Sequence, residues 1–72
     1  MDLKEAKHRA AVRLLAKEFK SRIANGMCLR VPDDIIDRID DKDIALFKEL
    51  CNTVGLKMIT EPATHYGYWE KR

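Results

Sequence analysis

The side chains with the strongest potential chemistry in this sequence are two cysteines and two histidines, which could bind a soft metal or pair as nucleophile and base. They are Cys28, Cys51, His8 and His65. Zinc sites draw their ligands from closely spaced pairs, and no two of these residues have such a spacing. Nothing in the local sequence supplies a base for a cysteine nucleophile. We therefore predict neither a zinc site nor a catalytic cysteine, and we interpret both thiols as reduced and buried.

A run of aspartates is the second concentration of ligand atoms: Asp33, Asp34, Asp37, Asp40, Asp41 and Asp43. The run has no glycine at a turn and no glutamate at the twelfth position, so it does not fit a calcium loop. No phosphate-binding loop or nucleophile motif occurs, and 72 residues leave little room for a substrate cleft. We expect a protein that is not an enzyme and uses no metal or cofactor. The acidic run suits a basic protein partner, or simply the starts of helices.

Positive side chains recur about once per turn near the N-terminus and form what we call the basic ridge: Arg9, Arg13, Lys17 and Lys20. Such a ridge can neutralise nucleic-acid phosphates, each contact adding affinity that weakens with salt. The same spacing is also typical of an ordinary solvated helix face. On a later predicted helix, Asn52 is a candidate to read adenine and Lys48 to reach guanine or a phosphate.

Three of the five aromatic residues fall within four positions near the C-terminus: Tyr66, Tyr68 and Trp69. Exposed tyrosine and tryptophan are favoured as anchors in protein interfaces. On a strand they can also stack on the bases of single-stranded nucleic acid. Alternation along a strand places the two tyrosines on one face and Trp69 on the other, so one face can instead close the core.

The elements that must position these residues follow from hydrophobic periodicity and from glycine and proline stops. We predict a helix over Asp2–Ala24, ended by Asn25 and Gly26. The later elements are a strand Met27–Val31 stopped by Pro32, a helix Asp33–Ile39, a helix Asp41–Val54 capped by Asp40 and ended by Gly55, a strand Leu56–Thr60, a turn at Pro62, and a strand His65–Trp69.

This order, α-β-α-α-β-β, predicts a single α+β domain over residues 1–72 with a short three-stranded antiparallel sheet. At the level of topology it resembles a winged-helix domain. The resemblance implies that the helix Asp41–Val54 is the recognition helix and that the turn at Pro62 is the wing. No apolar run is long enough to cross a membrane, and nothing indicates secretion, so we expect a cytoplasmic protein.

The sequence favours a binding module of one of two kinds. The first is a small nucleic-acid-binding or transcription-regulating protein that uses the basic ridge, Lys48 and Asn52. The alternative is a protein-interaction module that inhibits or adapts a larger host assembly, in the manner of many small bacteriophage proteins. Its anchors would be Tyr66, Tyr68 and Trp69, with acidic contacts from Asp37 and Asp41. Both kinds allow a homodimer.

Overall fold

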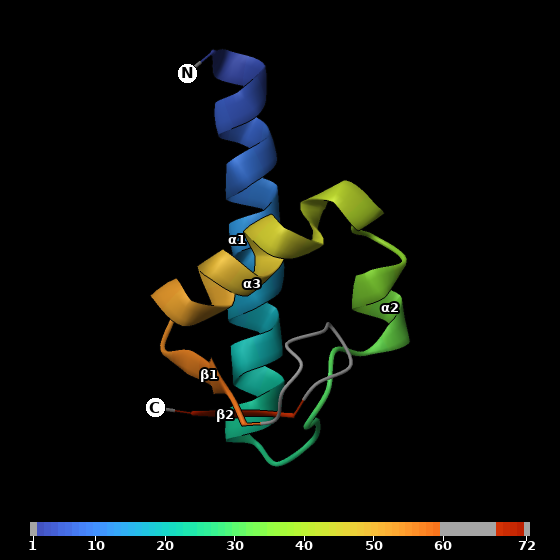
Figure 1. Ribbon diagram of the computed structural model, residues 1–72, viewed down its shortest axis with the longest axis vertical. Coiled ribbons are helices and arrows are strands. Elements are labelled where there is room, and N and C mark those ends of the chain that lie inside the picture. Colours follow the sequence, from blue (N-terminus) through green and yellow to red (C-terminus); the bar gives the residue numbers. More distant parts are fainter. Residues whose placement is uncertain (1, 60–67, 72) are drawn as a thin grey trace.

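One long helix, α1 (Leu3–Ala24), runs along the molecule, and the other elements gather beside its middle and its C-terminal end (Figure 1). The computed structural model describes residues 2–59 and 68–71. After α1 come α2 (Asp33–Ile36), a 3-10 turn η1 (Asp41–Asp43), α3 (Ile44–Thr53), and the strands β1 (Leu56–Met58) and β2 (Trp69–Lys71). In Figure 1, α3 crosses α1, α2 stands beside it, and the two strands lie near its lower end.

Both ends of α1 are fixed by local hydrogen bonds. At the start, the Asp2 side chain accepts from the backbone N–H of Glu5 at 2.8 Å, which satisfies one orphan donor of the first turn. At the end, Gly26 has a φ of +71°, and the next N–H, of Met27, donates to the carbonyl of Arg22 at 2.8 Å. This is the glycine-dependent helix stop that the sequence predicts.

The core is built from one stripe of α1 and from single faces of all the other elements except η1. Val12, Ala16 and Phe19 of α1 are buried, and they meet buried side chains of the later elements: Val31, Ile35, Phe47, Leu50, Cys51, Leu56 and Trp69. Phe19 sits at the centre, with its ring centroid 5.9 Å from those of both Phe47 and Trp69. The Trp69 contact is edge-to-face, a favourable geometry for aromatic pairs.

The sheet has two strands, not the three that the sequence predicts. β1 and β2 pair antiparallel, with Leu56 opposite Lys71 and Met58 opposite Trp69. The segment expected to be the third strand, Met27–Val31, is not a strand in the structure, and its Leu29 carbonyl accepts a hydrogen bond from the N–H of Trp69. A ladder cannot extend past Val31, because Pro32 has no N–H to donate.

The other boundaries also shift. The predicted helix Asp33–Ile39 ends at Ile36, after which i to i+3 bonds continue a tighter turn through Ile39. The predicted helix Asp41–Val54 begins as η1, and Asp40 precedes it without the expected side-chain cap. The expected strand Leu56–Thr60 is confirmed over Leu56–Met58. Of the described residues near the expected last strand, Tyr68 lies outside β2, and β2 begins at Trp69 and continues to Lys71. Thr60, the Pro62 turn and His65 lie outside the described residues.

The observed architecture is therefore a small mixed domain of helices with a two-stranded antiparallel sheet. The winged-helix resemblance is not confirmed. Its second helix has only four residues, its presumed recognition helix only ten, and the third strand is absent from the described part of the chain.

We predict that Phe19→Ala destabilises the domain by about 3–5 kcal/mol, because it removes the ring that joins Phe47 to Trp69. That loss approaches the whole stability expected of so small a domain. Urea unfolding followed by circular dichroism measures the effect. Leu14→Ala is the matched control, since Leu14 is on the same helix but 65% exposed. Equal losses from the two substitutions would contradict the assigned core.

Candidate functional site

The basic ridge does not act as one free surface, because its two ends are engaged by α3. Arg9 lies 3.6 Å from Glu49, measured between guanidinium nitrogen and carboxylate oxygen. Lys20 is half-buried, and its ammonium lies close to Gly55, just beyond the C-terminus of α3, where a positive charge is favourable. Arg13 and Lys17 between them are exposed and form no ion pair with any described residue.

The carboxylates of the α1 region face away from Arg13 and Lys17. Glu18 accepts from Arg22 at 2.9 Å and from Arg38 at 3.3 Å, which directs it toward α2. Asp2 and Glu5 lie near the N-terminus, on the wall of a cleft shared with Asp40 and Asp43. These acids, together with Asp34, Asp40 and Asp43 of the aspartate run, form what we call the acidic side. Arg13 and Lys17 lie on a different side of the molecule.

A network of four side chains links α2 to α1 on the acidic side: Glu18, Arg22, Asp34 and Arg38. The two terminal nitrogens of the Arg22 guanidinium, Nη1 and Nη2, donate to the Asp34 carboxylate at 3.0 and 2.9 Å. Arg38 adds a longer contact to Asp34 at 3.7 Å. The hydrogen bond from Arg22, more than any other cause, holds the pKa of Asp34 below its ordinary value. Part of the negative charge of the aspartate run therefore serves to join α2 to α1.

A shallow groove of about 260 Å³ lies between α1 and α3, beside the free part of the ridge. Ala6, Ala10 and Leu50 give it apolar walls, and Arg9 and Arg13 supply its charged walls. The small alanines, spaced one turn apart on α1, leave the space that the groove occupies. We refer to these five residues as the α1–α3 groove. Arginine side chains bind phosphate and carboxylate groups, and the apolar walls could contact an apolar part of the same ligand.

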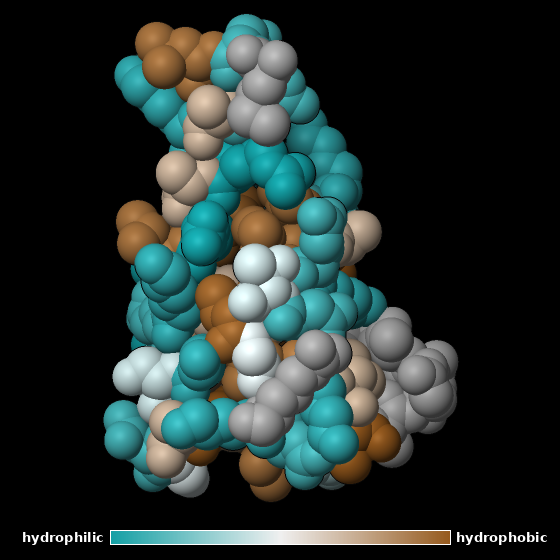
Figure 2. All heavy atoms as spheres, turned by 90° about the vertical axis from the view of Figure 1, so that its left-hand side faces the viewer, coloured by the Kyte–Doolittle hydropathy of each residue, from teal (hydrophilic) through white to brown (hydrophobic). Residues whose placement is uncertain are grey.

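Apolar side chains continue from the groove along the outer face of α1. Leu3 and Leu14 are 71% and 65% exposed and share a helix face with Ala10. Figure 2 shows brown and tan surface in the upper part of the molecule, where α1 extends beyond the other elements. Neither leucine belongs to the buried stripe of α1. They remain outside because α3 and the strands cover only one side of α1.

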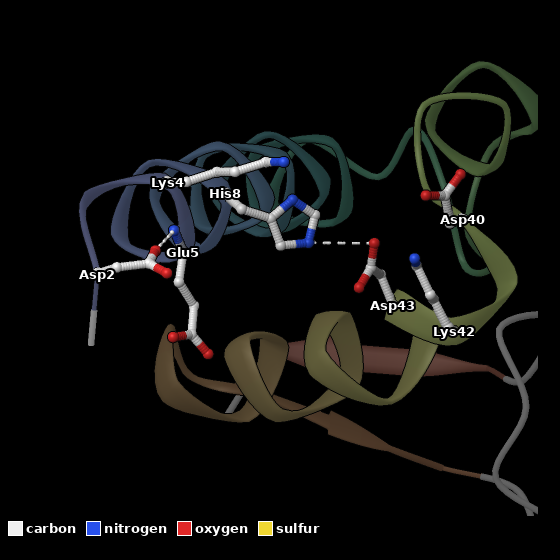
Figure 3. A pocket seen from close by; sticks show the side chains of 7 residues that line it. All are labelled: Asp2, Lys4, Glu5, His8, Asp40, Lys42 and Asp43. Atoms are coloured by element: carbon white, nitrogen blue, oxygen red, sulfur yellow. Dashed lines mark hydrogen bonds and ion pairs between the residues drawn. The ribbon is translucent and has the colours of Figure 1, made fainter.

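A larger cleft of about 420 Å³ separates the N-terminal part of α1 from η1 (Figure 3). The His8 ring points across it to Asp43, with Nε2 and the carboxylate oxygen 3.1 Å apart. His8 is therefore an exposed bridge between α1 and η1. The lining contains no serine, threonine or cysteine among the described residues. The histidine–carboxylate pair thus has no nucleophile to activate in this cleft.

Both described cysteines are free thiols, and Cys28 is only partly buried where the sequence predicts burial. Cys51 is completely buried in the core, and desolvation raises the pKa of its thiol to about 12. A thiol with so high a pKa contributes almost no thiolate at neutral pH, so Cys51 is not a nucleophile. Among the described residues, no group of three or more histidine, cysteine, aspartate or glutamate side chains is placed to hold a metal ion.

The structure scatters the remaining residues singled out in the sequence. Lys48 and Asn52 belong to α3, where Lys48 is half-buried and Asn52 exposed. Of the aromatic cluster, Trp69 is in the core and Tyr68 is 54% exposed. Tyr66 lies outside the described residues. The last two, Asp37 and Asp41, are exposed in the arm formed by α2 and η1.

Sequence reasoning did not find the α1–α3 groove or the engagement of Arg9 by Glu49. The spacing of Ala6 and Ala10 was a usable signal, because small residues one turn apart leave room beside a helix. The alanine spacing could not show that α3 forms the other wall of the groove. No described helix is both long and apolar enough to cross a lipid bilayer.

We predict that Arg22→Ala raises the pKa of Asp34 toward the ordinary aspartate value, because it removes the hydrogen bond that lowers it. A carboxyl whose folded pKa is lowered adds stability above its unfolded pKa and loses that stability as the pH falls through the folded value. Carboxyl NMR titration measures the change. Arg38→Ala is the control and should shift the pKa much less, since its contact is longer. An unchanged titration in Arg22→Ala would contradict the network.

Comparisons with protein-family models, with curated proteins and with solved structures found no match to this chain. The chemistry of the molecule therefore has to be argued from its own geometry. Three features stand out in that geometry: the exposed cations Arg13 and Lys17, the adjoining α1–α3 groove, and the separation of both from the acidic side.

Proposed function

We propose that this protein is a non-enzymatic module that binds nucleic acid along the basic ridge of α1. The observation that carries the proposal is the position of Arg13 and Lys17, which are exposed and unpaired among the described residues. The acids of the α1 region lie elsewhere, since Glu18 is directed toward α2 and Asp2 and Glu5 line the cleft near the N-terminus. A cation without an internal partner keeps its full charge for an external anion. A short row of such cations along a helix suits the repeated phosphates of a nucleic acid.

In this proposal α1 makes the main contact and α3 does not act as a recognition helix. α3 packs against both α1 and β1, which leaves it little freedom to enter a groove of duplex DNA. Its exposed Glu49 would also repel phosphates. Lys48 and Asn52 become accessory contacts at most, and the acidic side stays away from the nucleic acid.

A second candidate function, a protein-interaction module, is favoured by the exposed Tyr68, the residue just before β2. The N–H of Ile59 donates to the carbonyl of Tyr68 at 2.7 Å, which sets the two residues opposite each other. Both side chains are about half exposed, at 52% and 54%. A paired isoleucine and tyrosine form a small apolar patch of the kind that anchors protein partners. Trp69, being buried, takes no part in it.

We predict that Arg13→Ala/Lys17→Ala weakens binding of a labelled oligonucleotide at low salt by about tenfold, or about 1.4 kcal/mol. The slope of log K against log salt should also become shallower, by about 0.7 for each phosphate of a single strand that the variant no longer neutralises. Fluorescence anisotropy of the labelled nucleic acid measures both.

The matched control is Lys42→Ala/Lys71→Ala, which removes two exposed charges that form no ion pair with a described residue, one from η1 and one from β2. It should leave the affinity within about twofold of the unaltered protein, because a distant charge acts through screening solvent. Equal losses from both double variants would mean that net charge alone drives binding. No binding by the unaltered protein at low salt would overturn the nucleic-acid proposal and leave the Ile59–Tyr68 patch to be tested by Tyr68→Lys against candidate protein partners.

A further inference from the structure

We propose that the α1–α3 groove receives a nucleotide of single-stranded nucleic acid, and that Glu49 competes with its phosphate for Arg9. This inference rests on the proposed function and specifies the ligand of the same surface. It predicts that the protein prefers single strands to duplexes. It also predicts that Glu49, by pairing with Arg9, lowers the affinity for the nucleic acid.

The groove combines the two surfaces that a nucleotide unit needs. The alanines and Leu50 provide an apolar surface for a base or sugar, and Arg9 and Arg13 complete the lining with two positive charges. A guanidinium plane can stack on a base and can also hold a phosphate by paired N–H donors. A volume of about 260 Å³ admits one small group at a time.

The row of cations that begins in the groove and continues past it to Lys17 favours a nucleic acid over a peptide that carries a single carboxylate. Arg9, Arg13 and Lys17 follow one another at intervals of four residues, so they rise about 6 Å per step along α1. A lone carboxylate would occupy one of these cations and leave Lys17 unused. A polyanion uses them in succession, with one nucleotide seated in the groove.

The apolar part of the groove favours a single strand. In a duplex the bases are paired and stacked, so a backbone lying on the ridge would offer only phosphates and leave Ala6, Ala10 and Leu50 without a partner. An unpaired base can turn away from its neighbours and cover that apolar surface. The expected result is a preference for single strands that depends on the groove and not on the charges.

Glu49 occupies one of the cations in the free protein. Its carboxylate lies 3.6 Å from Arg9, and its side chain is 64% exposed. An ion pair of this length and exposure is weak, so a phosphate can displace it. Removing the carboxylate should therefore tighten binding, whereas nearly every other change at this surface should loosen it.

The experiment titrates labelled oligo-dT and a labelled mixed-sequence duplex of equal length with the unaltered protein and two variants, by anisotropy at low salt. Glu49→Gln should bind oligo-dT about two- to fivefold more tightly, the range expected for a weak exposed pair. Ala10→Gln places neutral bulk in the groove and should weaken oligo-dT binding at least threefold while changing duplex binding less than twofold. Ala10 is exposed, and glutamine is a good helix former, so the fold should tolerate the change.

The outcomes separate the inference from the proposed function. Tighter binding by Glu49→Gln together with a selective loss in Ala10→Gln supports the inference. Equal affinity for both oligonucleotides, or no effect of Ala10→Gln, overturns it while leaving binding along the ridge intact. Absence of binding to either oligonucleotide overturns both proposals. An acidic peptide that competes with oligo-dT for the groove and binds more tightly also overturns the inference.

Discussion

The burial of a single stripe of α1 is the constraint on which the rest of the structure depends. Phe19 contacts rings from α3 and β2 at once, and Ala16 lets those elements approach the helix closely. Ten of the described residues form the buried core, which is small even for a domain of this length. The later elements must therefore gather on one side of α1, and the opposite side stays open to solvent. The exposed leucines, the free cations and the α1–α3 groove all follow from that one-sided packing.

The same packing arranges the charges. Helix α2 is fastened to α1 by Arg22 and Asp34, which uses part of the aspartate run for structure. Glu49 of α3 comes within reach of Arg9, and the α3 C-terminus comes close to Lys20. Of the basic ridge, the middle therefore remains unpaired among the described residues. Exposed surface charges that make no ion pair add little to stability, so they can be used for binding.

The sequence allowed the helices and their stops to be predicted, because these depend on local signals such as Gly26, Gly55 and the stripe of α3. It did not allow the third strand to be excluded, since strand pairing depends on distant partners. The alternation of side chains along the last strand did not show whether the tyrosines or Trp69 face the core. In the structure Trp69 pairs with Met58 and is buried. The ion pair between Arg9 and Glu49 could not be predicted, because the spacing of residues along α1 does not show which side of the helix α3 packs against.

The most direct test of this account is an amide NMR titration of the protein with a short single-stranded oligonucleotide. Chemical-shift changes that follow α1 from Ala6 to Lys17 and extend across to Leu50 would agree with it. Such changes would locate the ligand on the open side of α1 without relying on any substitution. Changes confined to the α2–η1 arm or to the sheet around Tyr68, or saturation without any localised change, would contradict it.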